Sequence, residues 1–209
     1  MYERWSESGP KETCRFITLR TVDSIDVFVR PVYKQVIVHS LNHFIASKGL
    51  VVYAWCLMTH HLHLLACTRG AASLEELETA YKTFTSAKIL EAIETEPAVR
   101  KEWMLEHFRE PSHLFGFSKK YQVWENDPEP AAPVMIRKPH LLLEHIEHIH
   151  QNPVRDKIVE TPSEYLYSSA RDYTGVKGLV QIIKIPVIEQ QLAAMESING
   201  NFFVRYIRN

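Results

Sequence analysis

The hydrophobic and polar positions of this 209-residue chain form blocks that predict strands and helices in a definite order. Residues Cys14 to Val22 alternate apolar and polar side chains and are rich in β-branched and aromatic residues, which is typical of a strand. A helix is expected from Pro31, a favourable first-turn residue, to Gly49, a favourable terminator. The chain therefore begins with a strand followed by a helix.

Two strands and a second helix follow. Leu50 to Met58 is an almost continuous apolar run, which predicts a mostly buried strand, and His61 to Thr68 predicts another strand after a tight connection. Ser73 and Glu76 have the spacing of a capping box, so a helix is expected to start there and to run to about Glu94.

The order strand, helix, strand, strand, helix needs one more strand to complete a split β-α-β plan with an antiparallel sheet. Lys120 to Trp124 and Pro133 to Arg137 are the two candidates, separated by a loop rich in proline and acidic residues. The pattern thus predicts an α+β protein with helices packed on an antiparallel sheet.

The bulk composition restricts the class of protein without naming a function. With 45% hydrophobic and 23% charged residues, the composition is that of one ordinary globular domain. The formal net charge of -1 gives no overall positive field for a polyanion. Three cysteines without metal-site spacing suggest free thiols in a reducing compartment, and no apolar run approaches membrane-spanning length. We therefore expect a soluble cytoplasmic protein with no membrane partner.

Two histidines stand two residues apart in the predicted strand from His61 to Thr68. Because side chains alternate along a strand, His61 and His63 are expected to share one face while Leu62 and Leu64 share the other. Two adjacent imidazoles are half of a site for a divalent metal ion. The plainer interpretation is a hairpin strand with two polar residues on its open face.

A late helix could supply the other half of such a site. Residues Pro139 to Asn152 have helical periodicity, and Pro153 is expected to end the helix. His148 and Asn152 lie one turn apart on one stripe, so an imidazole and a carboxamide could reach a common point. A hard divalent ion accepts both kinds of ligand. Alternatively, Asn152 only satisfies carbonyl groups at the helix end.

The sequence resembles the single-tyrosine His-hydrophobic-His transposases, including the REP-associated tyrosine transposases, over roughly residues 14 to 175. That family has a Met-Pro-Asn-His-hydrophobic-His-Leu strand, matched by Met58 to Leu64 with Thr59 and His60 in place of Pro and Asn. Its helix ends in Tyr-Ile-His-x-Asn-Pro-Val-Arg, which is similar to His148 to Arg155. A downstream Pro-x-x-Tyr-x-x-Ser-Ser-x-x-x-Tyr stretch matches Pro162, Tyr165, Ser168, Ser169 and Tyr173.

The resemblance implies a ferredoxin-like (RNA-recognition-motif-like) domain over residues 1–175, with residues 176–209 as a C-terminal extension. It implies a homodimer that binds single-stranded DNA folded into hairpins. The family reaction is strand cleavage and rejoining by transesterification, in which a helix tyrosine attacks the phosphate beside a divalent metal ion. Carried over by position, the metal ligands are His61, His63 and Asn152, the ion is Mg²⁺ or Mn²⁺, and His148 occupies the nucleophile position.

Histidine at the nucleophile position is a departure from the family. Imidazole can attack phosphorus, but its adduct is more labile, and its nitrogen does not lie where a phenol oxygen would, so cleavage is expected to be weakened or lost. Three hypotheses follow: an enzyme that uses His148, a non-catalytic relative that binds metal and hairpin DNA, or a structural or protein-interaction role. In the second hypothesis, His148 could become a third imidazole ligand.

Several basic residues lie near the predicted site in the sequence and are candidates for contacts with DNA phosphates, although any one of them could simply be a solvated surface charge. The candidates are Lys82, Lys88, Lys119, Lys120 and Arg155, with Arg69, Arg137 and Lys138 nearby.

Overall fold

The computed structural model of the protein describes residues 13–69, 71–109, 121–126, 133–135 and 139–185. The helices and strands in these ranges are β1 (Thr13–Arg20), α1 (Pro31–Ser47), β2 (Leu50–Leu57), β3 (His61–Thr68), α2 (Leu74–Ile93), α3 (Ala98–His107), β4 (Pro133–Met135), α4 (Pro139–Arg155) and α5 (Ala170–Tyr173). Short 3-10 turns connect β1 to α1 and precede α5.

The strands form one antiparallel sheet in the order β2-β3-β1-β4. The predicted strands and helices therefore occur in the predicted order, and the split β-α-β plan is confirmed. Of the two candidates for the last strand, the second is the one that pairs with β1, through Thr13↔Met135 and Cys14↔Val134. The first candidate forms isolated bridges at Tyr121 and Trp124 instead.

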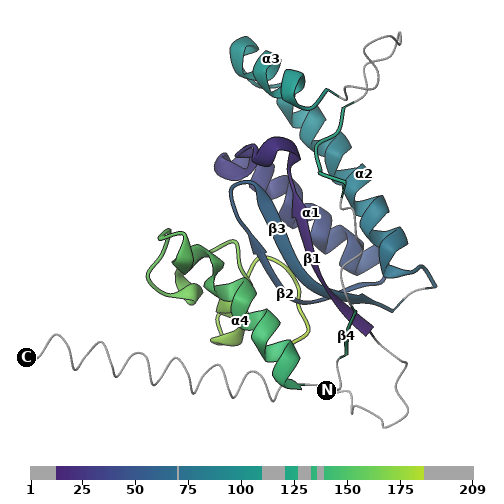
Figure 1. Ribbon diagram of the computed structural model, residues 1–209, viewed down its shortest axis with the longest axis vertical. Coiled ribbons are helices and arrows are strands. Elements are labelled where there is room, and N and C mark those ends of the chain that lie inside the picture. Colours follow the sequence, from purple (N-terminus) through teal and green to yellow (C-terminus); the bar gives the residue numbers. More distant parts are fainter. Residues whose placement is uncertain (1–12, 70, 110–120, 127–132, 136–138, 186–209) are drawn as a thin grey trace, which may run out of the picture.

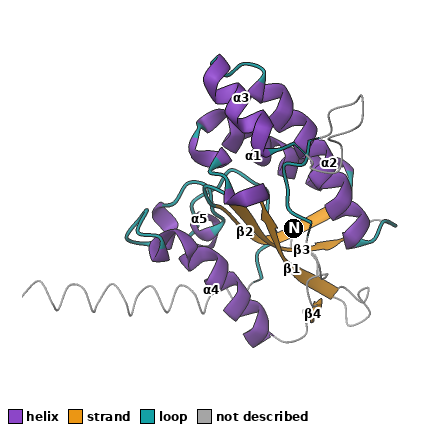
Figure 2. Ribbon diagram, turned by 45° about the horizontal axis from the view of Figure 1, so that its top comes forward, coloured by secondary structure: helices purple, strands orange, loops and turns teal. Residues whose placement is uncertain are grey.

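Helices cover both faces of the sheet (Figures 1 and 2). One hydrophobic core lies between the sheet and α1 with α2, and a second lies between the sheet and α4. All of β2 is buried: Val52 and Leu57 belong to the first core, and Val51 and Cys56 to the second. The continuous apolar run of β2 thus reflects a strand that packs against helices on both sides.

The outer edge of β2 is covered by the chain that follows α4. The backbone N–H of Leu57 donates to Tyr167 O at 2.9 Å, and Ser169 N–H donates to Trp55 O at 3.0 Å. Farther along, Ile183 N–H donates to Val52 O at 2.9 Å. These bonds satisfy backbone groups that an open sheet edge would leave unpaired.

Ser169 also connects this edge to α4. Its Oγ accepts a hydrogen bond from the backbone N–H of Trp55 at 2.9 Å and lies 2.8 Å from Nε2 of His150, a buried residue of α4. Burial lowers the pKa of His150 to about 3, so the imidazole is neutral and its Nε2 can accept the Ser169 hydroxyl proton. The motif histidine at position 150 is therefore a core residue.

Helix α4 does not end where the sequence predicted. Pro153 lies inside the helix, which continues to Arg155. Pro153 has no N–H to donate to the carbonyl four residues earlier, but the turn after it is held by Asp156 N–H, which donates to Asn152 O at 3.1 Å. The carbonyl of Pro153 accepts the N–H of Ile158 at 2.9 Å, which closes the helix end.

The start of the predicted C-terminal extension lies against the domain. Asn42 of α1 donates from Nδ2 to Leu179 O at 2.9 Å and accepts from Gln181 N–H at 3.0 Å, and Val180 is buried. The rest of the extension, from residue 186 onward, lies outside the described residues. Among the helices of the described part, none has the length and apolar character needed to cross a bilayer.

Replacement of Ser169 by alanine should destabilise the fold. Ser169→Ala leaves the buried Trp55 N–H and the His150 Nε2 without their partner, so the free energy of unfolding should fall by about 1–3 kcal/mol. Urea denaturation monitored by circular dichroism measures the change. Ser47→Ala, at an exposed position of α1, is the matched control and should change stability by less than about 0.5 kcal/mol. Equal stability of the two variants would contradict the role assigned to Ser169.

Candidate functional site

The two histidines of β3 lie on the face of the sheet that α4 covers. His61 and His63 are half-buried and buried, respectively, and their ring centroids are 4.6 Å apart. Leu62 and Leu64 lie in the core on the other side of the sheet. The predicted alternation along this strand is therefore confirmed.

Each of the two imidazoles is held through its Nδ1 atom. His63 Nδ1 lies 2.8 Å from the Thr18 hydroxyl, because Thr18 is the β1 residue directly opposite His63 in the sheet. His61 Nδ1 lies 3.1 Å from Nε2 of His60 in the connection between β2 and β3. Among the described residues, neither Nε2 atom has a hydrogen-bond partner, so both are available to a ligand.

Phe16 brings the histidines of α4 to those of the sheet. Its ring stacks on His63 at 5.3 Å and on His145 at 5.2 Å, and it meets His148 edge-on at 5.6 Å. The ring centroids of His63 and His148 are 5.7 Å apart. His63 of the sheet and His148 of α4 therefore meet around one aromatic ring.

The electrostatics of this cluster keep the imidazoles neutral. The pKa of His61 is lowered to about 4 and that of His63 to about 3, chiefly because burial disfavours the charged ring. The positive charge of Arg20 adds to both shifts, and that of Arg155 adds to the shift of His63. Neutral rings keep the nitrogen lone pairs that metal coordination requires.

His148 is exposed on α4 and pairs with an arginine. Arg155 Nη1 lies 3.1 Å from His148 Nδ1, and because guanidinium only donates, Nδ1 accepts this hydrogen bond. Burial, followed by the charge of Arg155 and the nearby His145, lowers the pKa of His148. The Nδ1 lone pair of the neutral ring is therefore occupied, and its proton is on Nε2.

Asn152 lies one turn beyond His148, as predicted. Its Nδ2 donates to His148 O at 3.4 Å, which is the helix-end hydrogen bond of the alternative interpretation. Within the described residues, no three His, Cys, Asp or Glu side chains are arranged to hold a metal ion. A site with His148 as third imidazole therefore has no support, and coordination by His61, His63 and Asn152 stays a prediction.

The predicted DNA-contacting residues are spread over the molecule. Arg155 lies at the histidine cluster, but Lys82 and Lys88 are on α2, across the sheet, where each forms an ion pair with a glutamate of the same helix. Lys119 and Lys120 lie outside the described residues, as do Arg137 and Lys138.

Four residues of the cluster were not singled out from the sequence: Phe16, Thr18, Arg20 and His60. Three of them alternate along β1, so the sequence pattern places them on one face of the strand. The pattern does not predict which face that is, or which residues of β3 lie opposite them. Arg20 proves to be opposite His61. That information is contained only in the register of the two strands.

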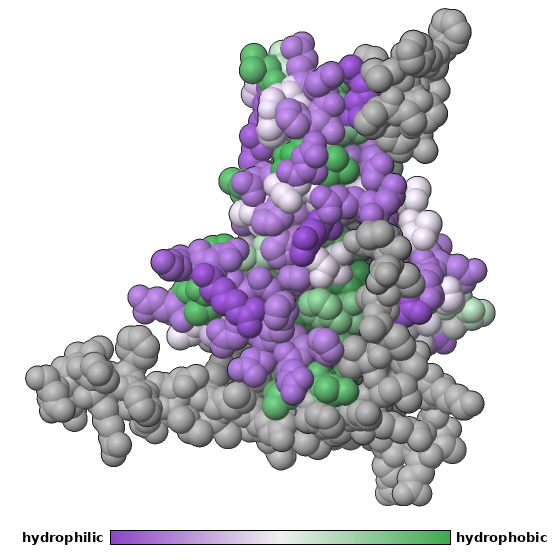
Figure 3. All heavy atoms as spheres, viewed as in Figure 1, coloured by the Kyte–Doolittle hydropathy of each residue, from purple (hydrophilic) through white to green (hydrophobic). Residues whose placement is uncertain are grey.

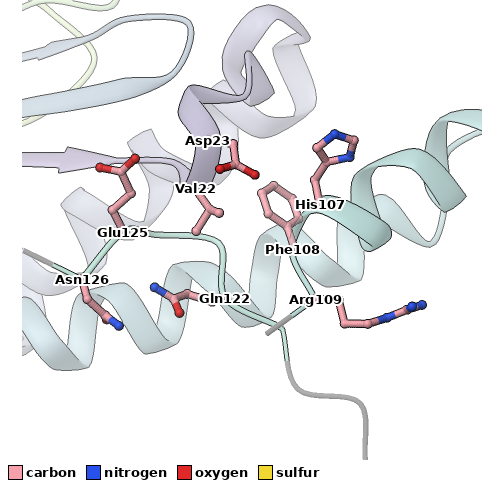
Figure 4. Close-up of a pocket in the computed structure, with 8 residues that line it drawn as sticks. All are labelled: Val22, Asp23, His107, Phe108, Arg109, Gln122, Glu125 and Asn126. Carbon is pink, nitrogen blue, oxygen red and sulfur yellow. The ribbon is translucent and has the colours of Figure 1, made fainter. Parts of the chain in front are cut away.

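Two hollows lie elsewhere, where α3 meets the end of β1. The first, of about 280 Å³, is lined by Val22, Asp23, His107, Phe108, Arg109, Gln122, Glu125 and Asn126 (Figure 4). The second, of about 540 Å³, shares Asp23 and His107 and also includes Trp103. Neither is lined by His61, His63 or His148, so the histidine cluster is not part of these hollows.

Comparison with known proteins identifies the fold. The sequence matches no protein-family profile and no curated protein. The structure is similar to a REP-associated tyrosine transposase bound to a REP hairpin, with a TM-score of 0.52 and 13% sequence identity over 88% of this chain and 92% of that chain. A candidate transposase from Deinococcus radiodurans R1 gives a TM-score of 0.40 and 16% identity over 72% of this chain and 98% of that chain. The first of these similarities shows that this chain has the fold of a REP-associated tyrosine transposase.

Proposed function

We propose that this protein binds single-stranded DNA folded into a hairpin, at a divalent-metal site on the α4 side of its sheet, and that it cleaves the DNA weakly or not at all. The observation that carries the proposal is the meeting of His61 and His63 with His148 and Arg155, in the fold of a protein seen bound to a REP hairpin. Homodimer formation, which the sequence resemblance implies, is part of the same proposal.

Two imidazole nitrogens and one amide oxygen would form an open donor set for a divalent ion. His61 and His63 would bind it through Nε2, and the Asn152 carboxamide oxygen, whose amino group already donates to a carbonyl, would be the third ligand. Mg²⁺ or Mn²⁺ would there neutralise charge on a DNA phosphate. The arginines at positions 20 and 155 would add positive charge next to that phosphate.

The surface around the site suits a polar partner. In the view of Figure 3, hydrophilic side chains predominate over α4, and apolar residues form only small separate patches. DNA-binding surfaces are polar and positively charged, whereas obligate protein interfaces are largely apolar. The polar surface over α4 therefore argues against a large apolar protein interface on this side of the molecule.

The pairing of His148 with Arg155 supports loss of cleavage. A neutral imidazole has one lone pair, and the Nδ1 lone pair of His148 accepts the hydrogen bond from Arg155. The remaining nitrogen carries its proton and cannot attack phosphorus. His148 would then bind a phosphate oxygen through Nε2–H, and it would position DNA instead of forming a covalent bond to it.

Restoring a tyrosine should restore covalent chemistry. In His148→Tyr, the phenol oxygen can attack phosphorus, the bond to the 3′ oxygen breaks, and a 5′-phosphotyrosine forms with release of the 3′ hydroxyl. We expect the variant to give a covalent adduct with a labelled hairpin oligonucleotide in Mn²⁺ or Mg²⁺, detected on a denaturing gel, and the original protein to give none.

Two further variants test the position of that chemistry. His145→Tyr puts a tyrosine one turn earlier on the same face of α4, against the same Phe16 ring, and should form no adduct. The double variant His148→Tyr, His63→Ala should lose the adduct because a metal ligand is removed. An adduct with the original protein would favour the hypothesis of an active enzyme instead.

Binding should depend on salt and on Arg155. Each phosphate contact releases counterions, so affinity should fall steeply as salt is raised, and Arg155→Gln should weaken binding and reduce the log–log slope by about 0.7–0.9. Fluorescence anisotropy with a hairpin oligonucleotide measures both quantities. Lys48→Gln, at the end of α1 remote from the cluster, should leave both unchanged. No hairpin binding by the original protein at low salt would remove the basis of the proposal.

A further inference from the structure

His60 lies between acceptor groups on one side and the predicted metal ligand His61 on the other. Its Nε2 is 3.1 Å from His61 Nδ1, and its Nδ1 is 3.6 Å from Asp26 Oδ1 and 3.3 Å from Thr59 Oγ1. We infer that His60 is a positioning residue that accepts the Nδ1 proton of His61 and thereby keeps the lone pair of His61 on Nε2, toward the metal ion. This inference rests on the proposed metal site.

The direction of the hydrogen bonds follows from the acceptor groups. Only one proton can lie between His60 Nε2 and His61 Nδ1. The Asp26 carboxylate lies 3.6 Å from Nδ1, which is beyond hydrogen-bond distance, but an ionised carboxylate there favours a proton on Nδ1 over a lone pair, and the Thr59 hydroxyl at 3.3 Å can accept that proton. In the neutral form of His60 the proton is therefore assigned to Nδ1. Its Nε2 then has the lone pair. His61 must therefore carry its own proton on Nδ1, which leaves Nε2 free to coordinate.

The backbone around His60 is fixed, as a positioning role requires. The carbonyl of His60 accepts from both the N–H and the hydroxyl of Thr21, at 2.9 and 3.0 Å. The carbonyl of Thr59 accepts the N–H of Phe28 at 2.8 Å. Thr21 and Phe28 are themselves fully buried. The connection between β2 and β3 is thus tied to the end of β1 and to the segment that follows it.

His61 and His63 differ in what holds them. The hydroxyl of Thr18 beside His63 Nδ1 can either donate or accept, so it fixes the ring without selecting a tautomer. His60 differs because the Asp26 carboxylate, 3.6 Å from its Nδ1, favours a proton on that nitrogen, so the His60 ring does select a tautomer of His61. Ring orientation and ligand basicity are both controlled by such partners, whose removal typically weakens metal affinity about 10- to 100-fold.

The matched variants are His60→Ala and His60→Gln. Alanine removes the acceptor, whereas the glutamine Oε1 can lie near the position of the histidine Nε2 and accept the same proton. His39→Ala, at an exposed position on α1, is the control for loss of a histidine.

Two measurements at pH 8 test the inference. The first is long-range ¹H–¹⁵N NMR of the metal-free protein labelled in histidine, with the His61 signals identified by their absence in His61→Gln. The second is the affinity for Mn²⁺ measured by electron paramagnetic resonance. We expect His61 to be protonated on Nδ1 in the original protein and to shift toward Nε2 protonation in His60→Ala. The Mn²⁺ affinity of His60→Ala should be about 10- to 100-fold lower than that of the original protein. His60→Gln and His39→Ala should retain both properties.

The outcomes separate this inference from the proposed function. If the original protein binds neither Mn²⁺ nor Mg²⁺, the proposed metal site is wrong and the role of His60 toward it is wrong as well. If the metal binds but His60→Ala leaves tautomer and affinity unchanged, only the inference about His60 is overturned. If His60→Gln loses as much affinity as His60→Ala, the inference is also overturned, because His60 would then be a ligand itself.

Discussion

The register of β3 against β1 is the constraint on which the candidate site depends. It places Thr18 opposite His63 and Arg20 opposite His61, on the side of the sheet that α4 covers. Because side chains alternate, a shift of one residue would turn both imidazoles into the hydrophobic core beneath α1 and α2. The apolar packing of Leu62 and Leu64 on that side therefore fixes the position of the polar site on the other.

Local patterns in the sequence were sufficient for the elements and for half of the site. The alternation of His61 with Leu62 and the helical spacing of His148 and Asn152 depend only on the period of a strand and of a helix, so both were predicted correctly. The choice between the two candidate last strands was not predictable, because it depends on which segment pairs with the free edge of β1 in the folded protein. The extension of α4 through Pro153 likewise depends on hydrogen bonds formed after the helix.

The partners of the histidines could not be predicted for a related reason. Phe16 and Thr18 come to the cluster through strand register, and Arg155 comes to His148 through the extra helical turn that Pro153 was expected to prevent. In the proposed function, the positive charge of Arg155 and the occupied Nδ1 lone pair of His148 favour holding a phosphate over attacking it, although the fold is shared with a tyrosine transposase.

The segment bonded along β2 has a consequence for assembly. Since Tyr167, Ser169 and Ile183 already occupy the backbone groups of that strand, a second copy cannot extend the sheet there without first displacing them. Among the described strands, the opposite border of the sheet is formed by β4. The segment that follows α4 therefore also prevents other chains from pairing with the edge of β2. A chain shortened before this segment would expose the long, apolar edge of β2 and should self-associate without defined symmetry.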